Sequence, residues 1–172
     1  MSEIYFDVET LRLSHEVPGG WSNIRGFGLA VGVTWDERNQ FRVWYEQDAV
    51  RLIEELGRFD RIITFNGERF DFQVLSAYGD VSMLYGKSLD LLRDLKQKLG
   101  FRLRLESLAQ ATLNCSKSGA GEMAVRWWRA GQIDRVVAYC QQDVQLLVDV
   151  VQFARANGYV RVPPRYIVRV NW

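Results

Sequence analysis

Two carboxylates lie close together near the start of the chain, where Asp7 and Glu9 accompany the apolar run 4–8. Side chains two residues apart on a strand project from the same face, so this pair is expected to point one way. Two adjacent negative charges repel each other unless a cation lies between them, and carboxylate oxygens suit a hard divalent ion. The pattern favours a metal site at a strand end. A strand end with two solvated acids is the alternative.

A third acid, Asp71, follows a strand and a turn. The β-branched run 62–65 predicts a buried strand, Asn66-Gly67 predicts a turn, and a helix is expected from about Arg69 to Ala77. Asp71 would then lie in the first helical turn near the carboxyl end of a strand, where open α/β sheets bind ligands. The alternative is that Asp71 only complements the helix dipole.

A fourth acid, Asp143, lies in a long predicted helix over 133–156, together with Tyr139. Helical spacing places Tyr139 and Asp143 on successive turns, beside a stripe that is expected to be buried. That stripe comprises Cys140, Val144, Leu147, Val148 and Val151. An amphipathic helix with a boundary acid and a half-buried tyrosine is the competing interpretation.

The elements that must position these residues alternate in type. A loop is expected over 11–26, two strands over 28–35 and 41–45, and a helix that Asp48 can cap, with Val50, Ile53, Leu56 and also Leu52 on its apolar face. Further helices are expected over 89–99, 107–114 and 123–129, a loop over 115–122, and an extended segment over 166–172. This order predicts an α/β fold, with a mixed sheet of about five strands flanked by helices, and a single domain over 1–172.

Composition is that of an ordinary globular protein. The 172 residues are 48% hydrophobic and 25% charged, and 22 Lys+Arg against 21 Asp+Glu leave a net charge of +1. Neither a membrane span nor a secretion signal is predicted, so a cytoplasmic location is expected. Cys115 and Cys140 form neither a disulfide framework nor a zinc motif, and they are interpreted as small buried residues.

Taken in order, three segments resemble the signature motifs of the DEDD exonucleases, the DnaQ-like branch of the ribonuclease H-like superfamily. They are Phe-Asp-Val-Glu-Thr over 6–10, Asn-x-x-x-Phe-Asp over 66–71 and Tyr-x-x-x-Asp over 139–143, and they extend over most of the chain. The stretches 87–91, 107–109 and 127–128 also resemble a little-characterised bacterial ribonuclease H-like exonuclease group. The histidine version of the last motif would need a histidine at Ala138, whereas Tyr139 matches the tyrosine version, DEDDy.

The resemblance implies a ribonuclease H-like fold and a hydrolase that removes nucleotides from the 3′ end of single-stranded DNA or RNA with two Mg²⁺ or Mn²⁺ ions. Asp7, Glu9 and Asp143 would hold the ion that carries the attacking water. Asp7 would bridge to the second ion, near which Asp71 acts. Tyr139 would orient the water, because a phenol with a pKa of about 10 is a poor base near neutral pH.

Substrate contacts are expected from the loop after the first acid pair and from the second motif. Thr10 and Leu11 follow Glu9 directly, and an apolar residue there could wedge against a terminal base. Trp21 could stack on a base, or it could pack the loop for stability. Asn66 and Phe70 complete the expected contacts.

Basic residues outside the motifs could line a groove for a single strand: Lys96, Lys98, Arg102 and Arg104 in one run, and Lys117, Arg126 and Arg129 near Trp127-Trp128. An ordinary solvated face is the alternative. Arg161, Arg165 and Arg169 near the C-terminus could add phosphate contacts. The pair Trp127-Trp128 is more typical of a core. Two other functions stay open, a catalytically weak nucleic-acid-binding module and an endonuclease with the same site. The choice between DNA and RNA and the oligomeric state are also open.

Overall fold

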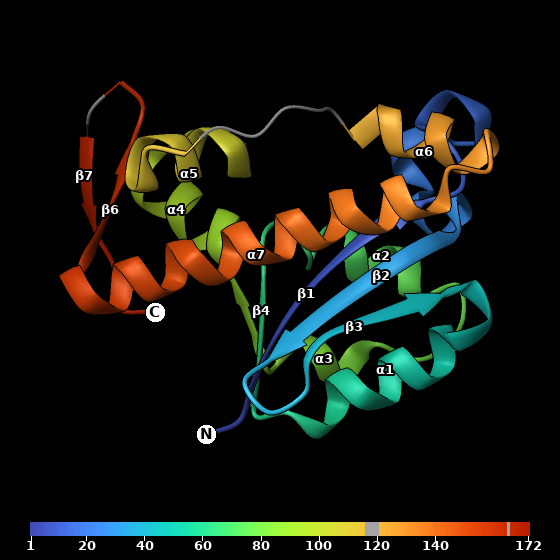
Figure 1. Ribbon diagram of the computed structural model, residues 1–172, viewed down its shortest axis with the longest axis horizontal. Coiled ribbons are helices and arrows are strands. Elements are labelled where there is room, and N and C mark those ends of the chain that lie inside the picture. The colour runs from blue at the N-terminus through green and yellow to red at the C-terminus, as the bar shows by residue number, and fades with distance from the viewer. Residues whose placement is uncertain (116–120, 165) are drawn as a thin grey trace.

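The computed structural model describes residues 1–115, 121–164 and 166–172, and its centre is a mixed β-sheet (Figure 1). The described strands of this sheet lie in the order β3-β2-β1-β4-β5. Their bounds are Glu3–Thr10 for β1, Leu29–Asp36 for β2, Gln40–Tyr45 for β3, Arg61–Thr64 for β4 and Ser88–Asp90 for β5. β2 runs antiparallel to β1 and β3, whereas β4 runs parallel to β1 and β5. The predicted α/β fold with a mixed five-stranded sheet is confirmed.

Helices cover both faces of this sheet. Their bounds are Ala49–Arg58 for α1, Asp71–Leu75 for α2, Ser82–Tyr85 for α3, Leu91–Leu99 for α4, Leu105–Leu113 for α5, Gly121–Arg129 for α6 and Ile133–Asn157 for α7. Short 3-10 turns Ser14–Glu16, Gly20–Ser22, Ile24–Phe27 and Glu46–Asp48 lie in the loops. Within the described residues, no helix has both the length and the apolarity needed to cross a membrane.

The alternation of β1 divides the core into two layers. Ile4, Phe6 and Val8 pack with the helices α1, α2 and α3 on one face of the sheet. Tyr5 packs on the other face with residues of α4, α5, α6 and α7. Because side chains alternate along a strand, Asp7 has the phase of Tyr5 and is presented on the α7 face.

Three expectations about helices need correction. Val50 is 53% exposed, because the buried face of α1 is formed by Ala49, Leu52, Ile53 and Leu56. Asp48 precedes α1 but makes no side-chain capping bond to it. The helix expected to open at Ser107 begins at Leu105, since the apolar face already starts there.

Two short strands were not predicted. β5 directly precedes α4, and its residues Leu89 and Asp90 fall in the stretch 89–99 that the apolar spacing assigned to a helix. The other is β6, Tyr159–Val162, which pairs with β7, Tyr166–Arg169, in a separate hairpin. The expected extended segment 166–172 is therefore partly a strand. Most of the loop expected over 115–122, together with Arg165, lies outside the described residues.

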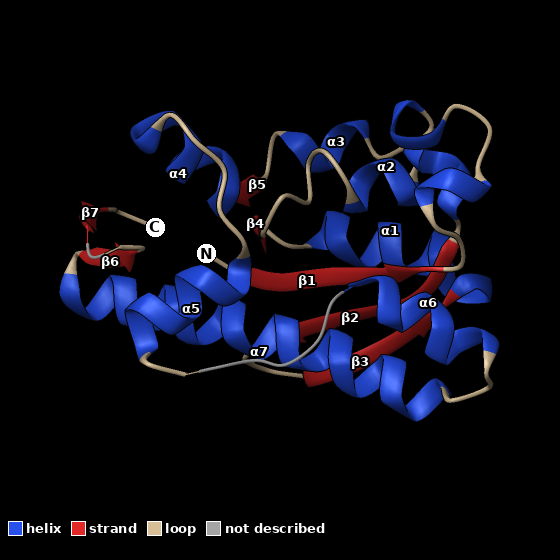
Figure 2. Ribbon diagram, turned by 90° about the horizontal axis from the view of Figure 1, so that it is seen from above, coloured by secondary structure: helices blue, strands red, loops and turns tan. Residues whose placement is uncertain are grey.

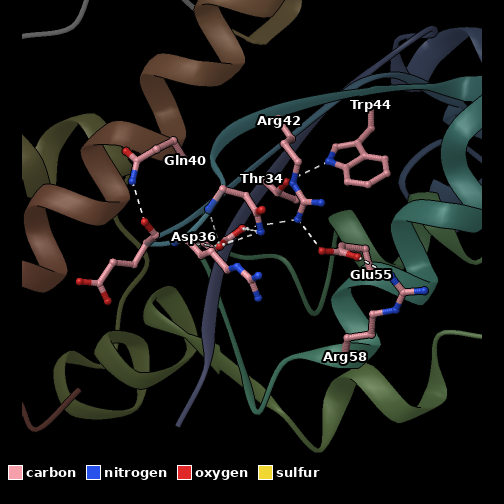
Figure 3. A network of polar contacts seen from close by, with 10 residues as sticks. Thr34, Asp36, Gln40, Arg42, Trp44, Glu55 and Arg58 are labelled. Carbon is pink, nitrogen blue, oxygen red and sulfur yellow. Dashed lines mark hydrogen bonds and ion pairs between the residues drawn. The ribbon is translucent and has the colours of Figure 1, made fainter.

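A polar network holds the β2–β3 hairpin against α1 (Figure 3). Arg42 of β3 lies between Asp36, at 3.4 Å, and Glu55 of α1. Asp36 is buried and also accepts hydrogen bonds from the backbone N–H groups of Arg38 and Asn39, so it fixes the turn as well. This network lies at the sheet end near Tyr5, because Tyr5 pairs with Trp35 at the start of the turn.

Candidate active site

The pairing of β1 changes along its length. Its parallel pairing with β4 covers only Glu3 to Tyr5, whereas its antiparallel pairing with β2 continues to Thr10. From Phe6 onward, β1 therefore has a strand neighbour on one side only. A backbone donor on the other side must find another partner, because buried N–H groups are almost always hydrogen-bonded.

Asp71 supplies that partner. Its Oδ1 accepts a hydrogen bond of 2.9 Å from the backbone N–H of Val8, which joins the first residue of α2 to β1. Asp71 is only 2% exposed. The pKa of this carboxyl is raised from 3.8 to about 7: burial is the largest cause, the Val8 N–H opposes it, and the charges of Asp90 and Asp143 add to the rise. The predicted position in a first helical turn is correct, and the bond to β1 adds a structural role.

Asp90 was missed by the sequence analysis and organises the turn before Asp71. This buried carboxylate accepts four backbone N–H bonds, from Asn66 at 2.8 Å, Glu68 at 3.2 Å, Leu92 at 3.0 Å and Arg93 at 3.2 Å. Two of these donors open α4 and two lie in the turn after β4. An Asp directly before a helix is an N-cap signal that could have been found. Its contact with a turn 24 residues away could not.

The turn itself allows little variation. Asn66 has a φ of +67°, a left-handed conformation that asparagine tolerates better than most residues. At Gly67, an added Cβ would lie 1.9 Å from Oγ1 of Thr64. Steric restrictions at positions 66 and 67 therefore favour the Asn-Gly pair, independently of the resemblance to the exonuclease motif.

Helix α7 presents Tyr139 and Asp143 at the same place. Tyr139 is 7% exposed, and its ring centroid lies 5.8 Å from that of Trp127 in an edge-on arrangement. Burial, followed by the negative charges of Asp143 and Glu9, raises the pKa of the Tyr139 phenol above its ordinary value of 10. The phenol therefore stays protonated near neutral pH and can donate a hydrogen bond.

Cys140 adds an unexpected contact to this group. Its Sγ lies 3.4 Å from the backbone oxygen of Asp7 and 3.5 Å from Asp7 Oδ2, so the thiol can donate to that residue. Burial and nearby acids raise the pKa of the thiol well above 9, so it is a neutral group here. Cys140 is buried as expected, whereas Cys115 is only half-buried.

The donor set fits a divalent cation. Ligand atoms of Asp7, Glu9 and Cys140 lie within 4.8 Å of one another, and two of the three are carboxylate oxygens. Asp71 and Asp143 line the same pocket. Burial and mutual repulsion raise the pKa of Asp71, so a cation would relieve a cost that the acids otherwise bear. Hard oxygen donors of this kind suit Mg²⁺ or Mn²⁺.

The four acids and Tyr139 line one pocket of about 560 Å³. Nine of the ten residues predicted for the site lie on its wall: Asp7, Glu9, Thr10, Trp21, Asn66, Phe70, Asp71, Tyr139 and Asp143. Leu11 is not among the lining residues. Its side chain lies beside Gly28, where an added Cβ would approach it to 3.0 Å, and its N–H bonds to the Gly28 oxygen.

An aromatic group forms another part of the wall. Trp21 lies 5.5 Å from Phe27 and 6.1 Å from Phe70 between ring centroids, and Phe27 lies 6.0 Å from Phe70. Trp21 packs its loop in this way, yet it remains 66% exposed. Phe27 was not predicted as a site residue.

Basic residues divide between the pocket and the surface. Arg102 and Arg104 line the pocket, and Arg102 Nη2 donates to Asn66 Oδ1 at 2.8 Å. Lys98 instead pairs with Asp94 at 2.6 Å. The two tryptophans 127 and 128 are partly buried against the core, as expected.

An ion pair that the sequence analysis did not predict connects two walls of the pocket. Arg129, at the end of α6, donates to the Glu16 carboxylate at 2.7 and 2.6 Å. Glu16 also accepts from the Leu13 N–H at 2.7 Å. These bonds lower the pKa of Glu16 from 4.5 to about 2. Residues from both segments, including His15 and Val125, line the pocket.

The mixed sheet and the acidic pocket beside it define an α/β protein with a candidate metal centre. A sequence profile described as RNase_H superfamily matches residues 4–155. The chain belongs to the RNase H superfamily.

Among solved structures, the chain is similar in fold to a family B DNA polymerase from the hyperthermophilic archaeon Pyrobaculum calidifontis. The match has a TM-score of 0.56 and 13% sequence identity, and it covers 90% of this chain. It covers 24% of the polymerase chain, so this chain spans about a quarter of that protein's length. At this identity the likeness concerns the fold alone. A comparison with curated proteins gives no match.

Proposed function

We propose that the protein is a metal-dependent 3′→5′ exonuclease that hydrolyses phosphodiester bonds at the end of single-stranded DNA or RNA. The observation that carries this proposal is the convergence of carboxylates from β1, α2 and α7 on one pocket, with Tyr139 beside them. Membership of the RNase H superfamily supports a nuclease. The order of the three motifs supports the tyrosine type of DEDD exonuclease, and we further propose a cytoplasmic location.

In this proposal, Asp7, Glu9, Asp71 and Asp143 hold two Mg²⁺ or Mn²⁺ ions. When bound, such ions supply positive charge that stabilises the attacking and leaving oxygens of an in-line displacement. Tyr139 is protonated, so it orients a water through its hydroxyl and does not remove the water's proton. Asp71 keeps its position through the Val8 N–H.

The substrate end would occupy the rest of the pocket. Trp21 and Phe70, with the buried Phe27 packed against both, offer aromatic surface on which a terminal base can pack, and such contacts tolerate any base. Thr10 and Asn66 lie on the same wall as polar contacts, and Arg102 and Arg104 supply positive charge for phosphates. Leu11 does not line the pocket, so we propose no direct contact between its side chain and the substrate.

The test compares matched DNA and RNA oligonucleotides, with free and blocked 3′ ends, in Mg²⁺ and in Mn²⁺. Shortening of the free ends only, with release of nucleoside monophosphates, is expected. Asp143→Asn should lower the rate by about 10²–10³-fold, because it weakens the hold on an ion whose charge stabilises the transition state. Asp134→Asn is the matched control, because Asp134 is an exposed acid on the same helix.

The outcomes separate the alternatives. Cleavage of circular single strands would indicate an endonuclease, since a circle has no end. Tight binding of oligonucleotides without cleavage in either metal would indicate a binding module. Equal activity of wild type and Asp143→Asn would refute the assignment of this pocket.

A further inference from the structure

The hairpin β6–β7 presents an outward face with positive charge and aromatic rings. Cross-strand pairing places Tyr159 opposite Arg169 and Arg161 opposite Ile167 on one face. The valines of the other face, 160, 162 and 168, are buried. Arg161, Ile167 and Arg169 are exposed, Ile167 to 63%. The whole segment 159–172 contains no acid.

Ring stacking and a hydrogen bond position the Arg161 side chain on this outer face. The Arg161 guanidinium lies 5.3 Å from the ring of Tyr159 and 5.8 Å from that of Phe153, and it donates to the Tyr159 hydroxyl at 3.0 Å. Neither Arg161 nor Arg169 forms an ion pair with another described residue. Stacking restricts the long side chain, so less freedom is lost when its remaining donors bind a phosphate.

Helix α5 connects this face to the pocket. Its first residues, Leu105 and Glu106, line the pocket. Near its other end, the hydroxyl of Thr112 accepts from the Arg161 N–H at 3.1 Å and donates to the Arg161 oxygen at 2.9 Å. The rise of about 1.5 Å per residue separates Glu106 from Thr112 by about 9 Å. Figures 1 and 2 both show the hairpin beside α5, at the end of α7 opposite to α6.

We propose that the outer face of the β6–β7 hairpin, formed by Tyr159, Arg161, Ile167 and Arg169, binds the sugar–phosphate backbone of a single-stranded nucleic acid whose end lies in the pocket. Positive charge without nearby acids in the segment fits a polyanion. Aromatic rings interleaved with arginines are typical of surfaces that bind single strands. The inference rests on the proposed function for the identity of the ligand. It concerns binding, which can be measured without cleavage.

The test measures binding of a nucleoside monophosphate and of a longer oligonucleotide, in Ca²⁺, over a range of salt concentrations. The variant is Arg161→Gln with Arg169→Gln. Each phosphate neutralised on a single strand contributes about 0.7 to the slope of log K against log salt, so loss of two contacts should lower that slope by about 1.4 for the longer strand. Binding of the nucleoside monophosphate should not change, because a single nucleotide occupies the pocket and does not extend along α5.

The matched control is Arg51→Gln with Arg58→Gln, which removes the same charge from exposed positions of α1. Arg161→Lys with Arg169→Lys keeps the charge and should keep the slope, and circular dichroism should show that every variant is folded. Unchanged affinity of the Gln variant for the longer strand, or an equal loss in the control, would overturn the proposal. So would a preference of the face for anionic lipid vesicles over oligonucleotides.

Failure of the two proposals can be told apart. Cleavage that does not depend on Arg161 and Arg169 at any substrate length would remove only the hairpin proposal. If wild-type protein bound no oligonucleotide at all, both proposals would fall.

Discussion

Replacement of Asp90 by Asn should loosen the turn that carries Asn66 and leads to Asp71. Oδ1 of Asp90 accepts three of the four N–H bonds, and Oδ2 accepts the fourth from Glu68. Asparagine keeps one acceptor oxygen, so its amide nitrogen would face the Glu68 N–H, a donor against a donor. The three remaining bonds would lose the strength that a charged acceptor gives them.

The size of the effect follows from these bonds. A hydrogen bond to a charged group contributes about 1.5–3 kcal/mol, so the loss of one such bond and the weakening of three should cost about 2 kcal/mol or more. For a chain of this length, that corresponds to a fall in Tm of about 4–8 °C. Asp90→Ala should be worse, because it also removes the N-cap of α4.

Urea unfolding followed by tryptophan fluorescence measures the free energy of unfolding, and differential scanning calorimetry measures Tm. Asp80→Asn is the control, because Asp80 is exposed and its carboxylate accepts from Ser82, including the Ser82 N–H at the start of α3, and not from a distant turn. If Asp90→Asn unfolds at the same urea concentration as the wild type, the carboxylate does not hold the turn and the reasoning is wrong. If Asp90→Asn is destabilised no more than Asp80→Asn, the four hydrogen bonds to Asp90 contribute no more to the free energy of unfolding than the contact of an exposed acid.

Three further results are expected. Asp71, which is buried, has a pKa of about 7 in the folded protein against 3.8 in the unfolded chain, so the folded state binds more protons between these values. In EDTA, the free energy of unfolding should therefore fall as pH rises from about 4 to 7, and Asp71→Asn should remove this dependence. A flat wild-type profile would contradict the prediction. Tyr139→Phe should lower kcat by roughly 100-fold, because the hydroxyl that orients the water is lost. The shape of the pH–rate profile should not change, because the raised pKa of Tyr139 keeps the phenol protonated near neutral pH. Loss of a titration near neutral pH in the variant would contradict this prediction. Glu16 has a pKa of about 2 in the folded protein and 4.5 in the unfolded chain. The wild type should therefore be more stable than Glu16→Gln above pH 4.5, and this difference in the free energy of unfolding should disappear as pH falls toward 2. A difference that persists at pH 2 would show that the Arg129 ion pair is not its source.

The parts of the site that sequence could predict are those fixed by local periodicity. The two-residue spacing of Asp7 and Glu9 on a strand, and the four-residue spacing of Tyr139 and Asp143 on a helix, hold whatever the rest of the chain does. Asp71 was placed in a helical turn by the Asn-Gly signal before it. These local rules, with the order of strands and helices, were also enough to predict the α/β sheet.

The parts that were missed depend on contacts between distant segments. Glu16 and Arg129 are 113 residues apart, and no local pattern marks either as a partner. The role of Cys140 beside Asp7 follows from how closely α7 packs on β1, which no spacing rule gives. Val50 was wrongly assigned to the buried face of α1. In a short helix, the sequence is compatible with more than one apolar face, and packing against the neighbouring strands determines which one is buried.

The position of the pocket follows from a single feature of the sheet. β4 ends its pairing with β1 at Tyr5, and the chain turns at Asn66 instead of extending the strand. If β4 continued, its backbone would take the outer N–H of Val8, and Asp71 would have no donor on β1 to bind. Because β4 stops, α2 begins beside the open edge and brings a carboxylate to the strand that already carries two. The early end of β4 therefore creates both the space for the pocket and the bond that places its third acid.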